Sequence, residues 1–373
     1  MGSVGSTAVF EPSAKMPRPK AGPPALERRP ANVARLFCSL SLAAEISLRV
    51  AGMAAVKKNL SLRPSSKPSW KPRIALFLRQ VGNEHQDMLR QDCRTAALRF
   101  GLIVNEDDAR NDANVQIDQI RACLQASLAL RPKALLVCPV EDSGLGGVAR
   151  EAVRLGIAWV SLNRAYDYLA ELRREFPGIA VFSVQPDQKE IGRIQAEQVR
   201  ILLPSGGEVA YIRGPLRTVS ANARDTSFRS SLAGAAIHVT PLSADWSVEG
   251  GRQAAKTWLA LAGRPKPEHC VIVAQNDSMA YGARLALGEA KPRSSDLSKM
   301  PVIGCNGAPE FGCRLVSDQT LTATVVVPSP ARCAVDTLAA VFAGGKPPWA
   351  DITLTVSSFP EPSVLASAGR KAR

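Results

Sequence analysis

Short apolar runs alternate with amphipathic stretches along the chain from residue 74 onward. The first run, 74–78, is continuously apolar, which is typical of a strand covered on both faces. Over 117–128, apolar residues recur every three or four positions, which predicts an amphipathic helix. Together the two patterns predict strands over 74–78, 102–104, 134–138, 157–162, 179–184, 208–212, 237–240, 270–274, 302–304 and 322–327. They predict helices over 88–98, 117–128, 145–155, 191–203, 221–232, 248–261, 278–287 and 331–342, with a polar loop between 163 and 178.

The strict alternation of strands and helices indicates the fold class. Strands that alternate with helices across short loops form a parallel sheet with helices on both of its faces. About ten strands are too many for one sheet of ordinary size. The sequence therefore predicts an α/β protein built from two doubly wound, Rossmann-like lobes.

The positive charge of the chain is concentrated at its two ends. The net charge is +14 over 373 residues. Residues 1–73 contain thirteen lysines and arginines against three glutamates, a surplus of +10, and Arg370, Lys371 and Arg373 add +3. This leaves a net charge of about +1 on the globular part. That part therefore has no surplus of positive charge with which to bind a phosphate backbone. The sequence does not favour a nucleic-acid partner.

The first 71 residues are rich in proline, serine, alanine and basic residues, which predicts a flexible arm. Met53 is an alternative start, in which case residues up to 52 would be untranslated. The best candidate export signal, 36–44, is short and has no clean cleavage site. No stretch is long and apolar enough to span a bilayer. The compartment stays open: cytoplasm, or periplasm and cell envelope if the protein is exported.

The sequence contains no constellation for metal or covalent chemistry. Its eight cysteines form no CxxC pair, and with only three histidines a Cys/His zinc site is not expected. Unpaired thiols fit a reducing compartment, although spacing alone does not exclude a disulfide. Neither a GxxxxGKS/T phosphate-binding motif nor a GxSxG nucleophile motif is present. We therefore expect no catalytic residues, no metal and no cofactor.

Polar residues follow several of the predicted strands. Asn83 comes shortly after the first strand, Asn163 and Arg164 follow the fourth, and Asn276 and Asn306 follow two later ones. Ligands of open α/β sheets bind outside the carboxyl ends of the strands. Amide and guanidinium groups hydrogen-bond in fixed directions, which suits a sugar or polyol whose hydroxyls both donate and accept. The alternative is that these are loop residues facing water.

Five segments of the chain carry a family resemblance. In chain order they are SLNR (161–164), DQKEIG (187–192), SANARDTSF (220–228), AQNDSMAYGA (274–283) and VIGCNG (302–307). They resemble motifs of periplasmic sugar-binding proteins of the ribose-binding type, in the family's order and across the whole globular part. The same type 1 periplasmic-binding-protein fold also forms the effector domain of lac-repressor-type regulators.

The resemblance implies two lobes joined by a hinge that the chain crosses three times, with closure of the lobes on a ligand. The implied division is 1–71 for the arm, 72–185 plus 328–350 for lobe one, 186–327 plus 351–359 for lobe two, and 360–373 for a basic tail. The implied crossings lie near 185–187, 327–328 and 349–351.

Eight positions match ligand-binding positions of the family. They are Asn83, His85, Asn163, Arg164, Arg224, Trp246, Asn276 and Asn306. Trp246 matches a position at which the family stacks an aromatic ring on the sugar, although a lone tryptophan in a loop is also typical of partial core.

Three of these positions depart from the family. His85, with Gln86 beside it, replaces an aromatic pair near the first strand, and Asn163 and Asn306 stand where the family usually has ligand-binding aspartates. Charge-assisted hydrogen bonds contribute roughly 1.5–3 kcal/mol, against about 1 kcal/mol for neutral ones. Losing two carboxylates beside Arg164 and Arg224 leaves the cleft more positive. We therefore expect a ligand with some anionic character, such as a sugar acid, or a modified polyol.

The resemblance implies a non-catalytic sugar-binding protein, either the substrate-binding component of an ABC-type uptake system or a sugar sensor. Its partners would be a small polar ligand and an ABC permease or a sensor protein. The first alternative is a transcription regulator of the lac-repressor type. It needs two compact helices for DNA binding, whereas 31–62 show only one vague helix, over 33–50. An enzyme on a Rossmann-like fold is the second alternative.

Overall fold

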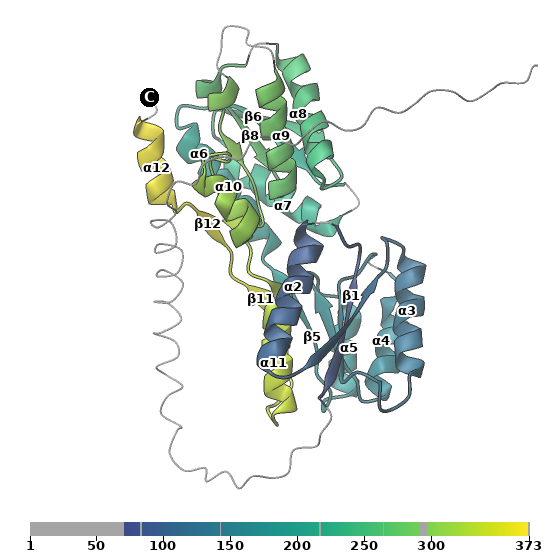
Figure 1. Ribbon diagram of the computed structural model, residues 1–373. Coiled ribbons are helices and arrows are strands. Elements are labelled where there is room, and N and C mark those ends of the chain that lie inside the picture. Colours follow the sequence, from purple (N-terminus) through teal and green to yellow (C-terminus); the bar gives the residue numbers. More distant parts are fainter. Residues whose placement is uncertain are drawn as a thin grey trace, which may run out of the picture. The chain divides into compact units, whose positions relative to one another are not determined.

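The computed structural model describes residues 71–82, 84–141, 143–215, 218–263, 265–290 and 297–371. Several expectations fall outside the described residues: Asn83, the arm through residue 70, the candidate export signal, the alternative start and the helix over 33–50. In the described part, strands and helices alternate around two parallel sheets (Figure 1). The predicted α/β class with two doubly wound sheets is confirmed.

The first lobe is built on a six-stranded sheet in the order β11-β5-β4-β3-β1-β2, with every pair parallel. Its strands are β1 (Arg73–Leu78), β2 (Ile103–Asp108), β3 (Ala134–Val137), β4 (Ala158–Leu162), β5 (Val181–Pro186) and β11 (Ile352–Leu354). Its helices are α2 (Glu84–Arg99), α3 (Ala113–Gln125), α4 (Leu145–Arg154), α5 (Asp167–Glu175) and α11 (Pro330–Phe342).

Both faces of this sheet are buried, which explains why β1 is apolar throughout. Ile74 and Leu76 pack with α2 and α11 on one face, and these two helices lie side by side although they are far apart in sequence (Figure 1). Ala75 and Phe77 pack with α3, α4 and α5 on the other face. Successive side chains of a strand point to opposite faces, so a strand between two helical layers has no polar side.

The second lobe repeats this design on a four-stranded parallel sheet in the order β7-β6-β8-β9. Its strands are β6 (Gly207–Arg213), β7 (Ile237–Ser243), β8 (Cys270–Ala274) and β9 (Val302–Ile303). Its helices and helical turns are α6 (Gln188–Leu202), α7 (Val219–Leu232), α8 (Val248–Ala262), η2 (Pro267–His269), α9 (Asp277–Glu289), η3 (Leu297–Lys299), η4 (Pro309–Cys313), α10 (Arg314–Ser317) and α12 (Pro362–Lys371). α8 and α9 cover one face, and α6, α7 and α12 cover the other.

The chain passes between the lobes three times. It leaves the first lobe after β5, where the side chain of Asp187 caps α6 by accepting from the N–H groups of Lys189 and Glu190. It returns after β10 (Thr324–Val326), where Ser329 caps α11 and Pro330 begins it. It crosses again between β11 and β12 (Ser357–Phe359), and β12 pairs antiparallel with β10.

Three expectations about the elements are wrong. The expected polar loop between 163 and 178 contains α5, whose apolar side chains Leu169 and Leu172 are buried. The third crossing does not lie at 349–351, because β11 adds to the first sheet beside β5. Residues 362–371 of the expected tail do not form a separate segment, since they form α12, which packs on α6 and buries Leu365.

Candidate ligand-binding site

The start of α2 and the ends of β3 and β4 bring His85, Cys138 and Asn163 together. Asn163 follows β4 and has a left-handed φ of 69°, a conformation that asparagine adopts more readily than most residues. Its Oδ1 lies 3.2 Å from His85 Nε2, and its Nδ2 donates to Cys138 Sγ at 3.4 Å. Gln86 Nε2 donates to the same sulfur at 3.2 Å. The thiol that follows β3 therefore fixes the direction of the Asn163 amide.

The imidazole of His85 is neutral at ordinary pH. Burial lowers its pKa to about 4, and the charges of Arg224 and Arg79 act in the same direction, although the hydrogen bond to Asn163 opposes them. Because Asn163 uses its Nδ2 on Cys138, its Oδ1 faces the ring, and Nε2 of His85 is the donor of that bond. Two expected site residues are thus joined in a defined orientation.

Arg164, the neighbour of Asn163, lies on an aromatic side chain. Its guanidinium carbon is 6.0 Å from the centroid of the Tyr166 ring, and its Nη1 is 3.4 Å from the Tyr166 hydroxyl. Ser161 Oγ donates to the Arg164 carbonyl at 2.7 Å, which fixes the backbone after β4. Tyr166 was not among the expected residues.

Arg224 is the buried cation of the second lobe, with 7% of its surface exposed. From α7 its Nε donates to Gln188 Oε1 at 2.7 Å and its Nη1 to the Gln275 carbonyl at 2.5 Å. Nη1 also lies 3.6 Å from Cys305 Sγ. No described residue accepts a hydrogen bond from its Nη2 group. The guanidinium is therefore held on one side and has two N–H donors left on the other.

Asn306 lies on the same side of the second sheet, directly after Cys305. It is 6% exposed and has a left-handed φ of 112°. Its backbone donates to Val325 and accepts from Val327, both at 3.0 Å, which ties the end of β9 to β10. Within the described residues its side-chain amide has no hydrogen-bond partner.

Asn276 and Trp246 form a third pair in this lobe. Asn276 caps α9, with Oδ1 accepting from Met279 N–H and Nδ2 donating to the Trp246 carbonyl, each at 2.8 Å. Trp246 has a left-handed φ of 73°, which is a strained conformation for a bulky residue. Its ring lies so close to Gly214 that a side chain there would overlap it, and it packs at the edge of the core beside α8 and α9. These contacts agree with the alternative that Trp246 is a partly buried core residue.

The two lobes meet at Glu84, the first residue of α2. Its Oε2 accepts from Ser278 Oγ on α9 at 2.7 Å. Burial raises the pKa of the Glu84 carboxyl to about 7. Burial and the nearby Glu84 also raise the pKa of Asp277, which accepts from Thr324 Oγ1 at 2.6 Å and from Gly307 N–H at 2.7 Å.

The described site residues therefore fall into two groups, one in each lobe. His85 and Asn163 make direct contact in the first lobe, beside Arg164, while Arg224 and Asn306 flank Cys305 in the second. The charge of Arg224 acts on His85 across the junction.

Sequence reasoning missed Glu84, Ser278, Gln188 and Gln275. Gln275 and Ser278 lie within the segment 274–283 and Gln188 within 187–192, so their positions were a usable signal, whereas Glu84 lies outside all five segments.

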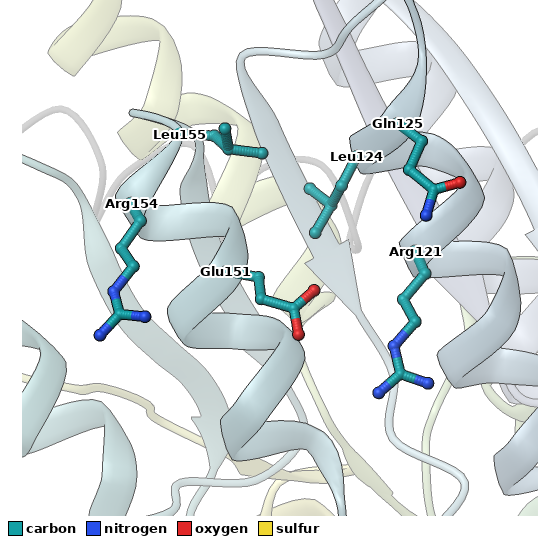
Figure 2. A pocket seen from close by; sticks show the side chains of 6 residues that line it. All are labelled: Arg121, Leu124, Gln125, Glu151, Arg154 and Leu155. Atoms are coloured by element: carbon teal, nitrogen blue, oxygen red, sulfur yellow. The ribbon is translucent and has the colours of Figure 1, made fainter.

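A surface hollow of about 420 Å³ lies elsewhere, between the ends of α3 and α4. Figure 2 shows its lining: Arg121, Leu124, Gln125, Glu151, Arg154 and Leu155. None of these residues belongs to the groups described above.

In the described part of the chain, no cluster of three His, Cys, Asp or Glu side chains could hold a metal. The described helices include none long and apolar enough to cross a membrane.

Comparison with known proteins identifies the family. The model of the family described as "Periplasmic binding protein domain" matches residues 74–346, which is most of the chain. The chain belongs to this periplasmic binding protein family. The expected resemblance and the expected type 1 periplasmic-binding-protein fold are confirmed.

The curated relatives that match this chain are named as binding proteins. The D-ribose/D-allose-binding protein of Pseudomonas aeruginosa is 28% identical over 225 residues, which cover 59% of this chain and 67% of that protein. The xylitol-binding protein of Mycolicibacterium smegmatis is 27% identical over 203 residues, which cover 54% of this chain and 52% of the relative. The ribose import binding protein of Escherichia coli is 25% identical over 272 residues and is covered to 82%.

Solved structures of periplasmic binding proteins share the fold. A Caulobacter myo-inositol binding protein bound to myo-inositol superposes with a TM-score of 0.64 and 23% identity, covering 83% of this chain and 99% of that one. A solute binding protein of Actinobacillus succinogenes with bound D-allose gives a TM-score of 0.67 and 19% identity, covering 80% of this chain and 100% of that one. At these identities the likeness shows the fold alone.

Proposed function

We propose that this chain binds a small polyhydroxylated ligand, a sugar or a polyol, between its two lobes and does not convert it chemically. The observation that carries the proposal is the state of Arg224. Gln188 and Gln275 hold the Nε and Nη1 of its guanidinium, so the remaining Nη2 donors are presented in a fixed direction. The two N–H groups of Arg224 Nη2 have no acceptor in the described residues, and Cys305, which lies 3.6 Å from Nη1, adjoins Asn306 in the chain. A ligand with several oxygen atoms would satisfy both side chains.

The first lobe supplies the complementary groups. Asn163 uses one of its two amide hydrogens on Cys138 and one acceptor position on His85, so one donor and one acceptor position remain. A hydroxyl group can donate to the second and accept from the first. Asn276 is similarly half used by the cap of α9 and the Trp246 carbonyl. An amide that is fixed in direction and has one donor and one acceptor position unused can recognise how the hydroxyls of a ligand are oriented.

The relatives support the same class of ligand. Those named above are described as binding D-ribose and D-allose, xylitol, or ribose, and the neighbouring structures hold myo-inositol and D-allose. Their shared chemistry is a row of adjacent hydroxyls on a compact carbon skeleton. We propose this chemistry for the ligand of this chain, with an ABC permease or a sensor protein as its partner.

Arg164 and Arg224 give the site positive charge, while the carboxyl of Glu84 at the junction of the lobes is neutral in the protonated state that its burial favours. A neutral polyol would pair with the amide groups of the site, and a sugar acid would also pair with the guanidinium groups. Ligands of both kinds belong in the test.

The test is a thermal-shift screen of the full chain followed by calorimetric titration. The probes are D-ribose, D-allose, xylitol, myo-inositol and D-glucuronate, with sodium chloride as the ionic control for the last. A ligand at a hundredfold excess over Kd stabilises the native state by about 2.7 kcal/mol, which gives a clear rise in Tm. We expect at least one probe to bind with one-to-one stoichiometry and to be recovered unchanged. Absence of any shift at millimolar concentration, or conversion of the bound probe, would contradict the proposal.

The regulator alternative depends on residues that lie outside those described, and no observation on the described residues favours it. The enzyme alternative lacks support as well. Members of the family are solute-binding proteins, and the carboxyls at the junction already accept hydrogen bonds: Glu84 from Ser278, and Asp277 from Gly307 and Thr324.

A further inference from the structure

We propose that Glu84 and Ser278 form a clasp between the two lobes that stabilises their closed arrangement and makes ligand affinity fall as the pH rises. The inference rests on the proposed function, because closure matters for affinity only if a ligand is enclosed. Glu84 is a positioning residue in this scheme: it acts by holding the lobes together.

The geometry of the clasp follows from the start of α9. The first N–H groups of a helix have no partner within the helix. Asn276 caps α9 and accepts from the Met279 N–H, while Glu84 Oε2 accepts from the hydroxyl of Ser278 at 2.7 Å. Glu84 belongs to α2 of the first lobe, so its bond with Ser278 exists only while the lobes are together.

The second oxygen of Glu84 decides which protonation state fits. Oε1 is buried and has no hydrogen-bond partner in the described part of the chain. An ionised carboxylate that leaves one buried oxygen unpaired carries a large desolvation cost. The neighbouring Asp277 is also acidic and adds like-charge repulsion. The closed arrangement therefore favours the protonated carboxyl of Glu84.

Other charged and titratable groups surround the clasp. Those around Glu84 and His85 are Asp277 on α9, Cys305 after β9, Arg224 on α7, Arg79 after β1, and Asp87 on α2 itself. Burial places the pKa of His85 at about 4 and that of Cys305 at about 11, so neither changes charge between pH 5 and 8. Asp277 bonds to Thr324 and Gly307 of its own lobe, and these bonds persist when the lobes separate. Glu84 is the group whose partners lie across the junction.

The sign of the effect follows from linkage. In the closed arrangement burial raises the pKa of Glu84 from 4.5 to about 7, and in an open arrangement the exposed carboxyl regains its ordinary value. Closure then takes up a proton. The contribution of Glu84 to the stability of the closed arrangement is fully present below about pH 4.5 and is lost as the pH rises through about 7. Ligand affinity should decrease by up to about tenfold for each pH unit within that window.

The first experiment measures the Kd of a ligand found in the thermal-shift screen between pH 5 and 8. The proteins are the full chain, Glu84→Gln and Ser278→Ala, with Glu151→Gln and Ser230→Ala as controls on exposed helix surfaces. We expect Glu84→Gln to remove the pH dependence and to bind at pH 8 as tightly as the unaltered chain binds at pH 5, because an amide keeps the acceptor without the charge. Ser278→Ala should weaken binding about tenfold. A pH profile unchanged in Glu84→Gln, or full affinity in Ser278→Ala, would overturn the clasp.

The second experiment needs no ligand and separates the clasp from the proposed function. Hydrogen–deuterium exchange followed by mass spectrometry reports on the amides of 276–283 in the full chain. Since the Ser278 hydroxyl donates to Glu84 and so holds the first turn of α9 against α2, we expect exchange in this segment to be several-fold faster in Glu84→Ala and unchanged in Glu84→Gln and Glu151→Gln. Equal exchange in Glu84→Ala and the unaltered chain would refute the clasp even if a sugar binds. Faster exchange with no binding of any probe would retain the clasp and refute the proposed function.

Discussion

Arg224 Nη1 and the backbone carbonyl of Gln275 lie 2.5 Å apart, which joins the middle of α7 to the turn between β8 and α9. Gln275 is itself fixed: its Nε2 donates to the Tyr211 hydroxyl and its Oε1 accepts from Gly214 N–H, at 2.9 and 3.0 Å. Gln188 holds the Nε of the same guanidinium from α6. Three elements thus set the direction of one buried cation, which is the preorganisation that a binding group needs.

Replacing Arg224 by lysine tests this arrangement. An ammonium group keeps the charge but cannot reach Gln188, Gln275 and a ligand with fixed geometry. We expect Arg224→Lys to weaken ligand binding at least tenfold and to lower the free energy of unfolding by about 1–3 kcal/mol. Calorimetry and urea denaturation measure the two effects. Arg200→Lys, on the exposed part of α6, is the matched control and should change neither. Normal affinity in Arg224→Lys would remove the main support for the proposed site.

Gly192 on α6 determines how closely α7 can approach. A Cβ at this position would overlap the backbone carbonyl of Arg224 and lie 2.9 Å from the Phe228 nitrogen. Gly192→Ala must therefore push α7 away and move Arg224. We expect a loss of about 1–3 kcal/mol in the free energy of unfolding, as for other overpacked sites, together with weaker ligand binding. Gly147→Ala on α4, where nothing lies within 4 Å, is the control. Equal stability of the two variants would contradict this account of the helix contact.

Much of the fold could be predicted because its strands are buried on both faces. Continuous apolar runs such as 74–78 and 270–274 have few alternatives to a central strand. β11 was missed because it is short, lies at the edge of the sheet and is only half buried. α5 was missed because its charged residues conceal the two leucines that pack inward.

The candidate site was predicted less completely, for a different reason. Resemblance supplied His85, Asn163, Arg224 and Asn306, since these occupy positions that follow strands or match a motif. It gave no reason to consider Glu84, whose role comes from a helix of the other lobe. Contacts between segments that are nearly two hundred residues apart do not follow from local pattern.

His85 should make stability depend on pH with a definite sign. Its pKa is lowered by burial from 6.5 to about 4, so the unfolded chain binds a proton that the folded chain rejects. The contribution of His85 to the free energy of unfolding is present above about pH 6.5. It is lost as the pH falls towards 4, by at most about 1.4 kcal/mol per pH unit. Glu84 acts in the opposite direction, so the quantity to measure is the difference in unfolding free energy between the unaltered chain and His85→Gln. We expect that difference to shrink in acid, whereas the exposed His238→Gln control should show no comparable trend.

Asp351 anchors the edge strand that sequence reasoning assigned to the wrong lobe. Its Oδ1 accepts from Ser183 N–H at 2.8 Å and from Arg173 Nη1 at 2.9 Å, and its Oδ2 accepts from Arg173 Nη2 at 3.2 Å. Burial acts to raise the pKa of Asp351, but the bonds from Arg173 and Ser183 outweigh it and the net pKa is lowered. The carboxylate therefore fastens β11 to β5 just before the chain crosses to the second lobe.

Asp351→Asn replaces one acceptor oxygen by an amide that opposes the Arg173 donors. We expect the free energy of unfolding to fall by about 1–3 kcal/mol at pH 7, as measured by urea denaturation. Because the pKa of the aspartate is lowered by folding, its contribution is present above the ordinary value of 3.8 and disappears as the pH falls below it. The difference between the two proteins should therefore narrow in acid. Asp118→Asn, on the exposed face of α3, should leave stability unchanged at every pH. If Asp351→Asn matched that control, β11 would owe its place in the first sheet to its backbone pairing with β5 alone.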